Sequence, residues 1–282
     1  MQRETFVLGA VAYDPKVVTI WEGFRAWFAE RDFDFDFVLY SNYERQVEAH
    51  LRGDFHVAWN SPLAWIETVR AAKRKGRHAE AIAMRDTDRD LTSVILVRSG
   101  TGIESVADLA GKRVGVGAPD SPQATLIPLG LLAERGLEPG RDFEVVRHDV
   151  LVGKHGDHIG GERDAVRALV RGSVDAACVI DGNHLLFVQE GLVTPGALSV
   201  VAQTEKYDHC NFTLLDDAPA GLATRFRELL VSMSYDDPKV RPLLDLEGLK
   251  VFLPGRTEGY APLERAVDRF RYLDAWLGRV TA

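Results

Sequence analysis

The sequence has few cysteines, no excess of basic residues and no long hydrophobic run. Cys178 and Cys210 are the two cysteines among 282 residues, so a disulfide framework is excluded. Lys and Arg total 34 against 42 Asp and Glu, a formal charge of −8. This balance argues against a nucleic-acid partner, which would require a basic face. The chain has 46% hydrophobic residues, which excludes a disordered protein.

The amino terminus has neither a signal peptide nor a membrane helix in the sequence given. The apolar stretch at residues 6–11 is too short and too poorly flanked for either. We therefore expect no membrane insertion. If Met1 is the native start, the expected location is the cytoplasm. If a leader was removed, the protein is expected in the periplasm or anchored at the surface.

Strand-like and helix-like patterns alternate along most of the chain, which is typical of sheets flanked by helices. A first alternation runs from residue 6 to residue 97, and a second begins near residue 98. The predicted strands include 6–12, 33–40, 55–59, 93–97, 113–116, 143–147, 176–180, 198–203 and 211–215, with another ending near Arg85. The predicted helices are 17–30, 43–51, 62–75, 123–135, 163–171, 220–233, 240–246 and 262–277.

The end of the chain is mostly helical, and such helices must pack on a sheet that is already built. We therefore predict an α/β protein of two lobes, each a mostly parallel sheet flanked by helices. The first lobe is discontinuous and comprises residues 1–97 and 205–282. The second, residues 98–204, is inserted into it, and two crossing strands join them.

Two local motifs repeat between the lobes. Asn60-Ser61-Pro62 and Asp120-Ser121-Pro122 each end a predicted strand and begin a helix. Ser is a favourable N-cap and Pro suits the first helical position, so each motif leaves N–H groups and a positive helix end at the top of a strand. The motifs predict either a pair of sites for an anion or carboxylate, or helix capping alone.

Several segments in a fixed order carry a family resemblance. They are Ser41–Ala49, Phe55–Trp65, Thr92–Arg98, Ile103–Val114, Gly160–Val166 and Ser173–Ala177. In these segments the chain resembles the type-II periplasmic binding proteins, and within them the phosphonate-binding subunits of ABC importers. The resemblance implies a protein that binds a small polar or anionic organic solute between its lobes, with an ABC permease as partner.

The resemblance also implies individual ligand-binding residues. Tyr43 stands where the family has a ligand-contacting tyrosine, Asn60 and Ser61 stand at the first-lobe helix start, and Asp181 ends a strand where an acidic or polar residue meets the ligand amine. His209 and Cys210 lie at the predicted return crossing between the lobes, where either one of them contacts the ligand or the segment is a hinge with a buried cysteine.

Two departures from the family pattern predict a ligand other than a simple phosphonate. The Ser-Thr-Ser of the second-lobe helix start is replaced by Ser121-Pro122-Gln123, which removes two hydroxyls and one N–H group, and the usual histidine is replaced by Glu162. Asp120 and Glu162 would also repel a doubly charged anion. We expect a less negative solute, or one with a cationic or hydrogen-bond-donating group.

Histidines and a carboxylate in the second half of the sequence suggest a metal site as an alternative. His155, His158, Glu162 and His209 are ligand types that bind Zn or Fe, but their spacing matches no specific signature such as HExxH. No cofactor is therefore expected. The complete set of predicted ligand-binding residues is Tyr13, Tyr43, Asn60, Ser61, Arg85, Ser121, Gln123, His158, Glu162, Asp181 and His209.

The sequence favours solute binding over catalysis because it has no strong catalytic signature. His209 and Cys210 are adjacent, so in an extended segment their side chains would point to opposite faces, which argues against a Cys–His dyad. The alternative is an intracellular enzyme on the same fold, a lyase or a metal-assisted enzyme that uses the region of His155, His158, Glu162 and His209. Fold alone does not decide between the two.

Overall fold

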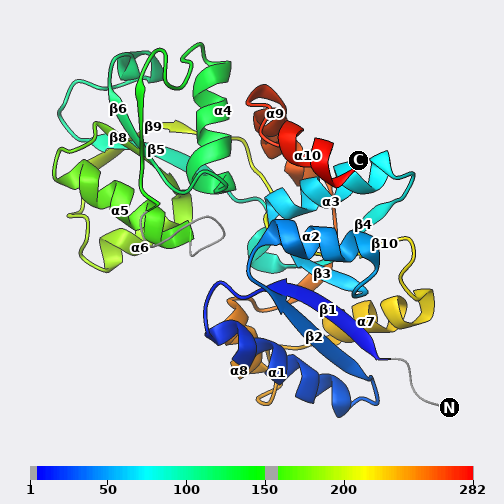
Figure 1. The fold of residues 1–282 in the computed structure, drawn as a ribbon. Helices are drawn as coiled ribbons and strands as arrows, with labels where there is room; N and C mark the ends of the chain where they lie inside the picture. The colour runs from blue at the N-terminus through cyan, green and yellow to red at the C-terminus, as the bar shows by residue number, and fades with distance from the viewer. Residues whose placement is uncertain (1–4, 150–157, 282) are drawn as a thin grey trace. The chain divides into compact units, whose positions relative to one another are not determined.

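The computed structural model describes residues 5–149 and 158–281, and these form two compact units. The first comprises Met1–Arg89, Asp208–Tyr260 and Leu273–Ala282, and the second comprises Asp90–Tyr207 and Ala261–Tyr272 (Figure 1). The sequence assigned all of 205–282 to the first lobe, whereas residues 261–272 pack with the second unit. No helix in the described part of the chain is long and apolar enough to cross a membrane.

The first unit is built on a mixed sheet with the strand order β11-β4-β10-β3-β1-β2. Strand β1 pairs in parallel with β2 and β3, whereas β10 runs antiparallel to both β3 and β4. The strands are β1 (Phe6–Val11), β2 (Phe35–Tyr40), β3 (Val57–Asn60), β4 (Ala79–Arg85), β10 (Asn211–Leu215) and β11 (Phe252–Pro254).

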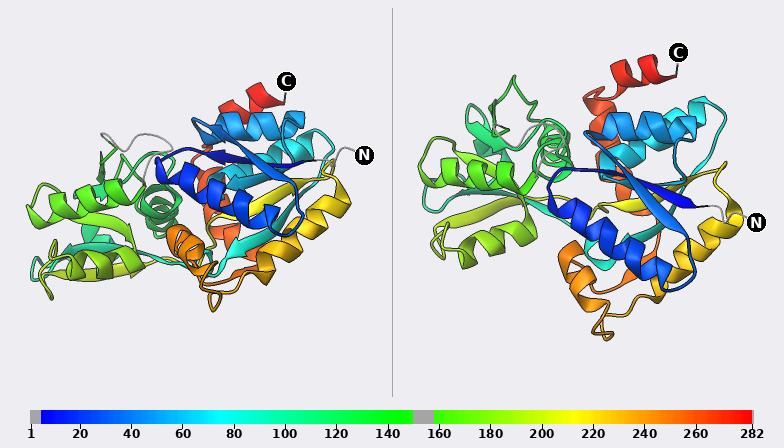
Figure 2. Two further views of the ribbon diagram at one scale, coloured as in Figure 1. Left: turned by 90° about the horizontal axis from the view of Figure 1, so that it is seen from below. Right: turned by 60° about the horizontal axis from the view of Figure 1, so that its bottom comes forward.

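Helices cover both faces of this first sheet. Successive side chains of a strand point to opposite faces, and apolar side chains on both faces need to be covered. Helices α1 and α7 lie on one face (Figure 2). There Phe6 packs in a large aromatic core with Phe28 of α1 and Phe226 of α7. On the other face Ala58 packs with Ala49 of α2. The helices of this unit are α1 (Lys16–Ala29), α2 (Tyr43–Arg52), α3 (Pro62–Arg74), α7 (Ala220–Ser232), α8 (Arg241–Glu247) and α10 (Asp274–Val280).

The second unit is built on a mixed sheet with the strand order β7-β6-β8-β5-β9. Strand β6 pairs in parallel with β7 and β8, whereas β5 runs antiparallel to β8 and β9. The strands are β5 (Ser93–Arg98), β6 (Arg113–Val116), β7 (Glu144–Arg147), β8 (Ala176–Ile180) and β9 (Leu198–Gln203). The helices are α4 (Ile127–Glu134), α5 (His158–Val170), α6 (Asp181–Gln189) and α9 (Ala261–Arg269).

Alternate residues of β5 face the two layers of helices in the second unit. Ile95 belongs to the core that contains Leu132 of α4, whereas Val94 belongs to the core that contains Leu169 of α5 and Phe187 of α6 (Figure 1). Residues 94–97 of β5 are consecutive apolar residues, as a strand buried on both faces requires.

The predicted α/β class and the order of most elements are confirmed, but α6 and β11 were not predicted, and three further differences concern a helix, a turn and the sheets. The predicted helix 262–277 is wrong as a single element: α9 and α10 are separate, and Arg271 between them has a left-handed φ of 50° that a continuous helix cannot contain. Helix α4 is preceded by a π-helical turn at Pro122–Leu126. The third difference is the sheets, which are mixed rather than mostly parallel, because β5 and β10 each run antiparallel to both of their neighbours.

His50 on α2 makes the stability of the protein dependent on pH. Its ring is 1% exposed and stacks on Phe55 at 4.7 Å, and burial lowers its pKa to about 4. The unfolded chain, with an ordinary His pKa near 6.5, then binds more protons than the folded one between these two values. We expect stability to fall by up to about 3 kcal/mol as the pH drops from 6.5 to 4.

Urea unfolding of wild type and His50→Gln across this pH range measures the effect. The variant should show a clearly smaller pH dependence, because it lacks the buried imidazole. His78→Gln, at an exposed histidine, is the matched control and should keep the wild-type slope. Equal slopes in wild type and His50→Gln would show that His50 is not responsible.

Candidate functional site

The first sheet gathers polar side chains at a single edge. Strands β1, β2, β3 and β4 share one direction, so their carboxyl ends meet at the same edge as the amino end of the antiparallel β10. Tyr13 follows β1, Tyr43 follows β2, Asn60 and Arg85 end β3 and β4, and His209 precedes β10. We call this the first carboxyl edge. Ligands of open α/β sheets bind outside such edges.

Arg85 at this edge is held by carboxylates of the protein itself. Its Nε and Nη2 donate to the two oxygens of Asp88 at 2.6 and 2.9 Å, and Nη1 donates to the carbonyl oxygen and Oε2 of Glu247 at 2.7 and 3.1 Å. The guanidinium also lies 5.2 Å from the centre of the Trp59 ring. Burial raises the pKa of Asp88, but Arg85 lowers it more, to about 2. Arg85 therefore organises this edge, with its charge already paired.

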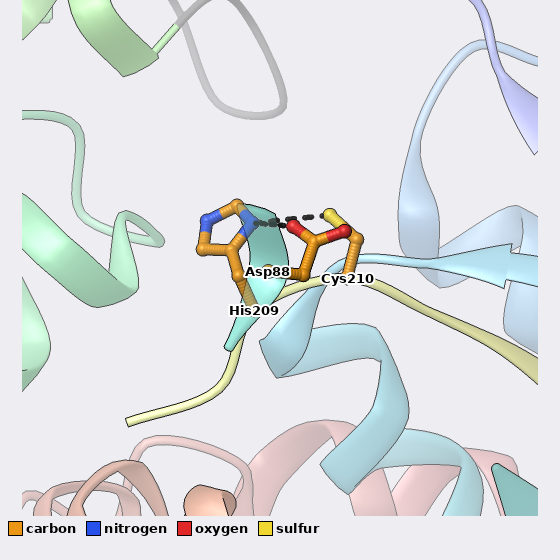
Figure 3. A group of neighbouring side chains, drawn as sticks. All are labelled: Asp88, His209 and Cys210. Atoms are coloured by element: carbon orange, nitrogen blue, oxygen red, sulfur yellow. Dashed lines mark hydrogen bonds and ion pairs between the residues drawn. The ribbon is translucent and has the colours of Figure 1, made fainter. Parts of the chain in front are cut away.

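Asp88, His209 and Cys210 meet beside this ion pair (Figure 3). His209 Nδ1 lies 3.1 Å from Cys210 Sγ and 3.5 Å from Asp88 Oδ1. The expectation that the side chains of His209 and Cys210 point to opposite faces is wrong, because β10 begins only at Asn211 and the two residues precede it. Burial lowers the pKa of His209, but Cys210 and Asp88 raise it more, to about 10.

Asn60 lies inside the first unit rather than on its surface. It is fully buried, its Oδ1 accepts from Gln46 Nε2 at 2.8 Å, and its Nδ2 donates to the hydroxyls of Thr68 at 3.3 Å and Thr213 at 2.8 Å. Its amide therefore joins α2, β3, α3 and β10. Ser61 next to it caps α3 by accepting from the Ala64 N–H at 3.2 Å.

The two tyrosines of the first carboxyl edge are more accessible. Tyr13 is 40% exposed, and burial of its hydroxyl together with the negative charge of Glu247 raises its pKa to about 12. Tyr43 is half-buried and begins α2, which Asn42 caps by accepting from the Arg45 N–H at 2.9 Å. A tyrosine hydroxyl can act as a hydrogen-bond donor or as an acceptor.

The second sheet gathers a second set of polar side chains. The parallel strands β6, β7 and β8 end at one edge, where β5 begins. Ser121 follows β6 and caps the π-helical turn by accepting from the Ala124 N–H at 3.2 Å. Ser93 at the start of β5 donates its hydroxyl to the Gln123 carbonyl at 2.7 Å and contacts the Tyr207 hydroxyl at 2.7 Å. We call this the second carboxyl edge.

Glu162 is a buried carboxylate at the second carboxyl edge. Its side chain accepts from the Ile180 N–H and from Asn183 Nδ2, both at 2.9 Å, so it lies at the end of β8 next to the half-buried Asp181. The residue before it must be glycine, because a Cβ at Gly161 would lie 2.7 Å from the His148 carbonyl oxygen. This close approach brings α5 against the end of β7.

The structure groups the predicted residues differently from the predicted metal set. His155 and the side chain of His158 lie outside the described residues, and Glu162 and His209 belong to different units. Asp88, Glu247 and Asn183 belong to the edges but were not among the predicted site residues. Asp88 could have been predicted, because it follows Arg85 by three residues at the end of a strand. No sequence pattern points to Glu247 or Asn183.

Two α/β units with polar side chains at the carboxyl edges of their sheets are the architecture of two-lobed solute-binding proteins, and the family match shows the role. The family model for the ABC transporter phosphonate periplasmic substrate-binding proteins matches residues 9–260, and the chain belongs to this family. The prediction of a solute-binding protein of phosphonate-type ABC importers is therefore confirmed. The family is one of substrate-binding proteins, with a small-molecule ligand and a transporter as partner, and it gives the enzyme alternative no support.

Solved structures share the fold at low sequence identity. PhnD1 from Prochlorococcus marinus, in complex with methylphosphonate, is similar with a TM-score of 0.69, 16% identity and coverage of 95% of this chain and 98% of its own. XAC2383 from Xanthomonas citri bound to ATP has a TM-score of 0.73, 15% identity and coverage of 96% and 99%. The sulfonate-binding protein SsuA from Escherichia coli has a TM-score of 0.59, 15% identity and coverage of 97% and 94%.

Proposed function

We propose that this protein binds a small organic solute that carries a cationic or hydrogen-bond-donating group, in preference to a simple phosphonate. The supporting observation is the acidic character of the second carboxyl edge. Glu162 is fully buried there, Asp181 follows it at the end of β8, and Asp120 is 4% exposed beside the Ser121 cap. Carboxylates at this edge attract an ammonium group and repel a dianion.

The helix start at this edge fits the same ligand class. Pro122 has no N–H to donate, and the Ser121 hydroxyl already accepts from the Ala124 N–H. The Oε1 atom of Gln123 is buried without a hydrogen-bond partner within the described residues, and Gln123 is 6% exposed. A buried acceptor of this kind favours a ligand with an N–H or O–H group, because leaving it unpaired costs about 1–3 kcal/mol.

We further propose that the mature protein works in the periplasm and delivers its solute to an ABC permease. Membership in a family of periplasmic substrate-binding proteins supports this assignment. The Tyr13 and Tyr43 hydroxyls at the first carboxyl edge are proposed as further ligand contacts. Arg85 is proposed to position this edge rather than to bind the solute, because its donors are taken by Asp88 and Glu247.

Calorimetric titration with matched ligand pairs tests the proposal. The probes are methylphosphonate, an alkyl sulfonate and inorganic phosphate, each compared with an amino-substituted organic counterpart. We expect at least one amino-bearing compound to bind tenfold or more tightly than its partner, a difference of about 1.4 kcal/mol. Asp181→Asn should remove most of this preference. Asp164→Asn, at an exposed carboxylate paired with Arg167, is the control and should retain it. Equal or tighter binding of the unsubstituted phosphonate would overturn the proposal.

A further inference from the structure

Asp88, His209 and Cys210 present three different metal-ligand atoms in one place within the first unit. Asp88 Oδ1, His209 Nδ1 and Cys210 Sγ lie within 4.8 Å of one another, with Nδ1 3.1 Å from the sulfur and 3.5 Å from the carboxylate oxygen. The usual zinc bond lengths place neighbouring ligand atoms about 3.3–3.6 Å apart around a tetrahedral ion. The two distances from His209 Nδ1 are therefore close to those around one ion, and the third, between Asp88 Oδ1 and Cys210 Sγ, lies within 4.8 Å.

The backbone of the two ligand-bearing segments is already fixed. The His209 N–H donates to the Asp88 carbonyl at 2.7 Å, and the Tyr260 hydroxyl donates to the His209 carbonyl at 2.8 Å. Arg85 donates to both oxygens of the Asp88 carboxylate, Oδ1 included, and so fixes its orientation, as donors around a metal centre do for ligating carboxylates. In Figure 3 the imidazole turns Nδ1 toward Asp88 and Cys210, and its other nitrogen points away from them.

The charges around the group match a divalent cation. When a metal ion displaces the Cys210 thiol proton, the Asp88 carboxylate and the resulting thiolate would supply two negative charges, which balance one divalent ion. Arg85 and Glu247 pair with each other at 3.1 Å and add no net charge. Asp88 and Cys210 are 1% and 7% exposed, so an ion bound between them would be shielded from water on that side. His209 keeps 22% of its side chain exposed, which leaves an approach from solvent.

We propose that Asp88, His209 and Cys210 form a binding site for a thiophilic divalent transition metal, with Zn²⁺ as the best match. Thiolate, imidazole and carboxylate are the three ligand types that Zn²⁺ takes in proteins. Three protein ligands leave the fourth tetrahedral position to a water molecule or another small ligand. This site differs from the metal set expected from the sequence, with which it shares only His209, and it does not depend on the proposed solute.

Titration of the reduced, chelator-treated protein with Co²⁺ tests the site, because cobalt bound to a thiolate gives a near-ultraviolet charge-transfer band. We expect one equivalent of Co²⁺ to produce this band and one equivalent of Zn²⁺ to remove it. Cys210→Ser should lose the band and bind Zn²⁺ at least tenfold more weakly. Cys178→Ala is the matched control at the other cysteine, which is fully buried in the second unit, and should behave as wild type.

A second measurement uses the unaltered protein, so it does not depend on the folding of a variant. Zn²⁺ should protect Cys210 of the wild-type protein from alkylation by iodoacetamide, as read by peptide mass mapping. The proposal fails if wild type gives no thiolate band with Co²⁺. It also fails if the band persists in Cys210→Ser, or if Zn²⁺ leaves the alkylation rate of Cys210 unchanged.

Discussion

Replacing Asp88 with Ala should destabilise the protein by about 3–5 kcal/mol, because it removes the bidentate partner of the largely buried Arg85 guanidinium. The Asp88 side chain is 2% exposed and its carboxylate receives two hydrogen bonds from Arg85. Without it, Arg85 keeps Glu247 as its one acidic partner in the described network. Urea unfolding at neutral pH, monitored by tryptophan fluorescence, measures the loss.

A double variant separates the unpaired charge from the loss of packing. Asp88→Ala combined with Arg85→Met should recover part of the stability, because the guanidinium is removed with its partner. Glu247 also loses Arg85, but burial already raises its pKa, so it can take up a proton instead of staying charged. Asp36→Ala is the control: Asp36 pairs with Arg25 on the surface, where both side chains are about half exposed, and its loss should cost about 0–1 kcal/mol. A double variant less stable than Asp88→Ala would contradict this explanation.

The edges of the two sheets could be predicted from the sequence because strand direction follows from local patterns. Tyr13, Arg85 and Asp181 were each placed at a strand end, and each lies at a carboxyl edge. An alternation of strands and helices predicts parallel strands, and the carboxyl ends of parallel strands lie at the same edge of the sheet. The helix starts at Ser61 and Ser121 were likewise predictable from N-cap chemistry, and both serines cap as expected.

The group of Asp88, His209 and Cys210 could not be predicted, because it depends on long-range pairing. Strand β10 returns antiparallel between β3 and β4, with Asn211 opposite Asn60, and this register brings His209 to the end of β4. No spacing within the sequence encodes a contact between residues so far apart along the chain. The contact between Glu247, at the end of α8, and Arg85 also joins residues far apart along the chain. The local sequence pattern of this helix therefore does not predict it.

Asn60 shows a different limit, since a family motif identifies a position and not the direction of its side chain. The resemblance implied a ligand contact, whereas the side chain is fully buried and bonded to Gln46, Thr68 and Thr213. The neighbouring Ser61 is half-buried at the start of α3. Side chains of adjacent residues in an extended segment point in opposite directions, so a shift of one position changes which side a side chain faces.

Asn60→Ala should therefore destabilise the protein by about 2–4 kcal/mol, because it removes three buried hydrogen bonds. Gln46 Nε2 would retain its bond to the Trp59 carbonyl at 3.1 Å, whereas the Thr213 hydroxyl would lose its donor inside the sheet. Asn42→Ala is the matched control, since the same substitution there removes only a helix cap and should cost about 1 kcal/mol. Chemical unfolding of both variants measures the difference. Equal losses would mean that Asn60 contributes no more than a cap, and that its place in the network does not determine the stability of the first unit.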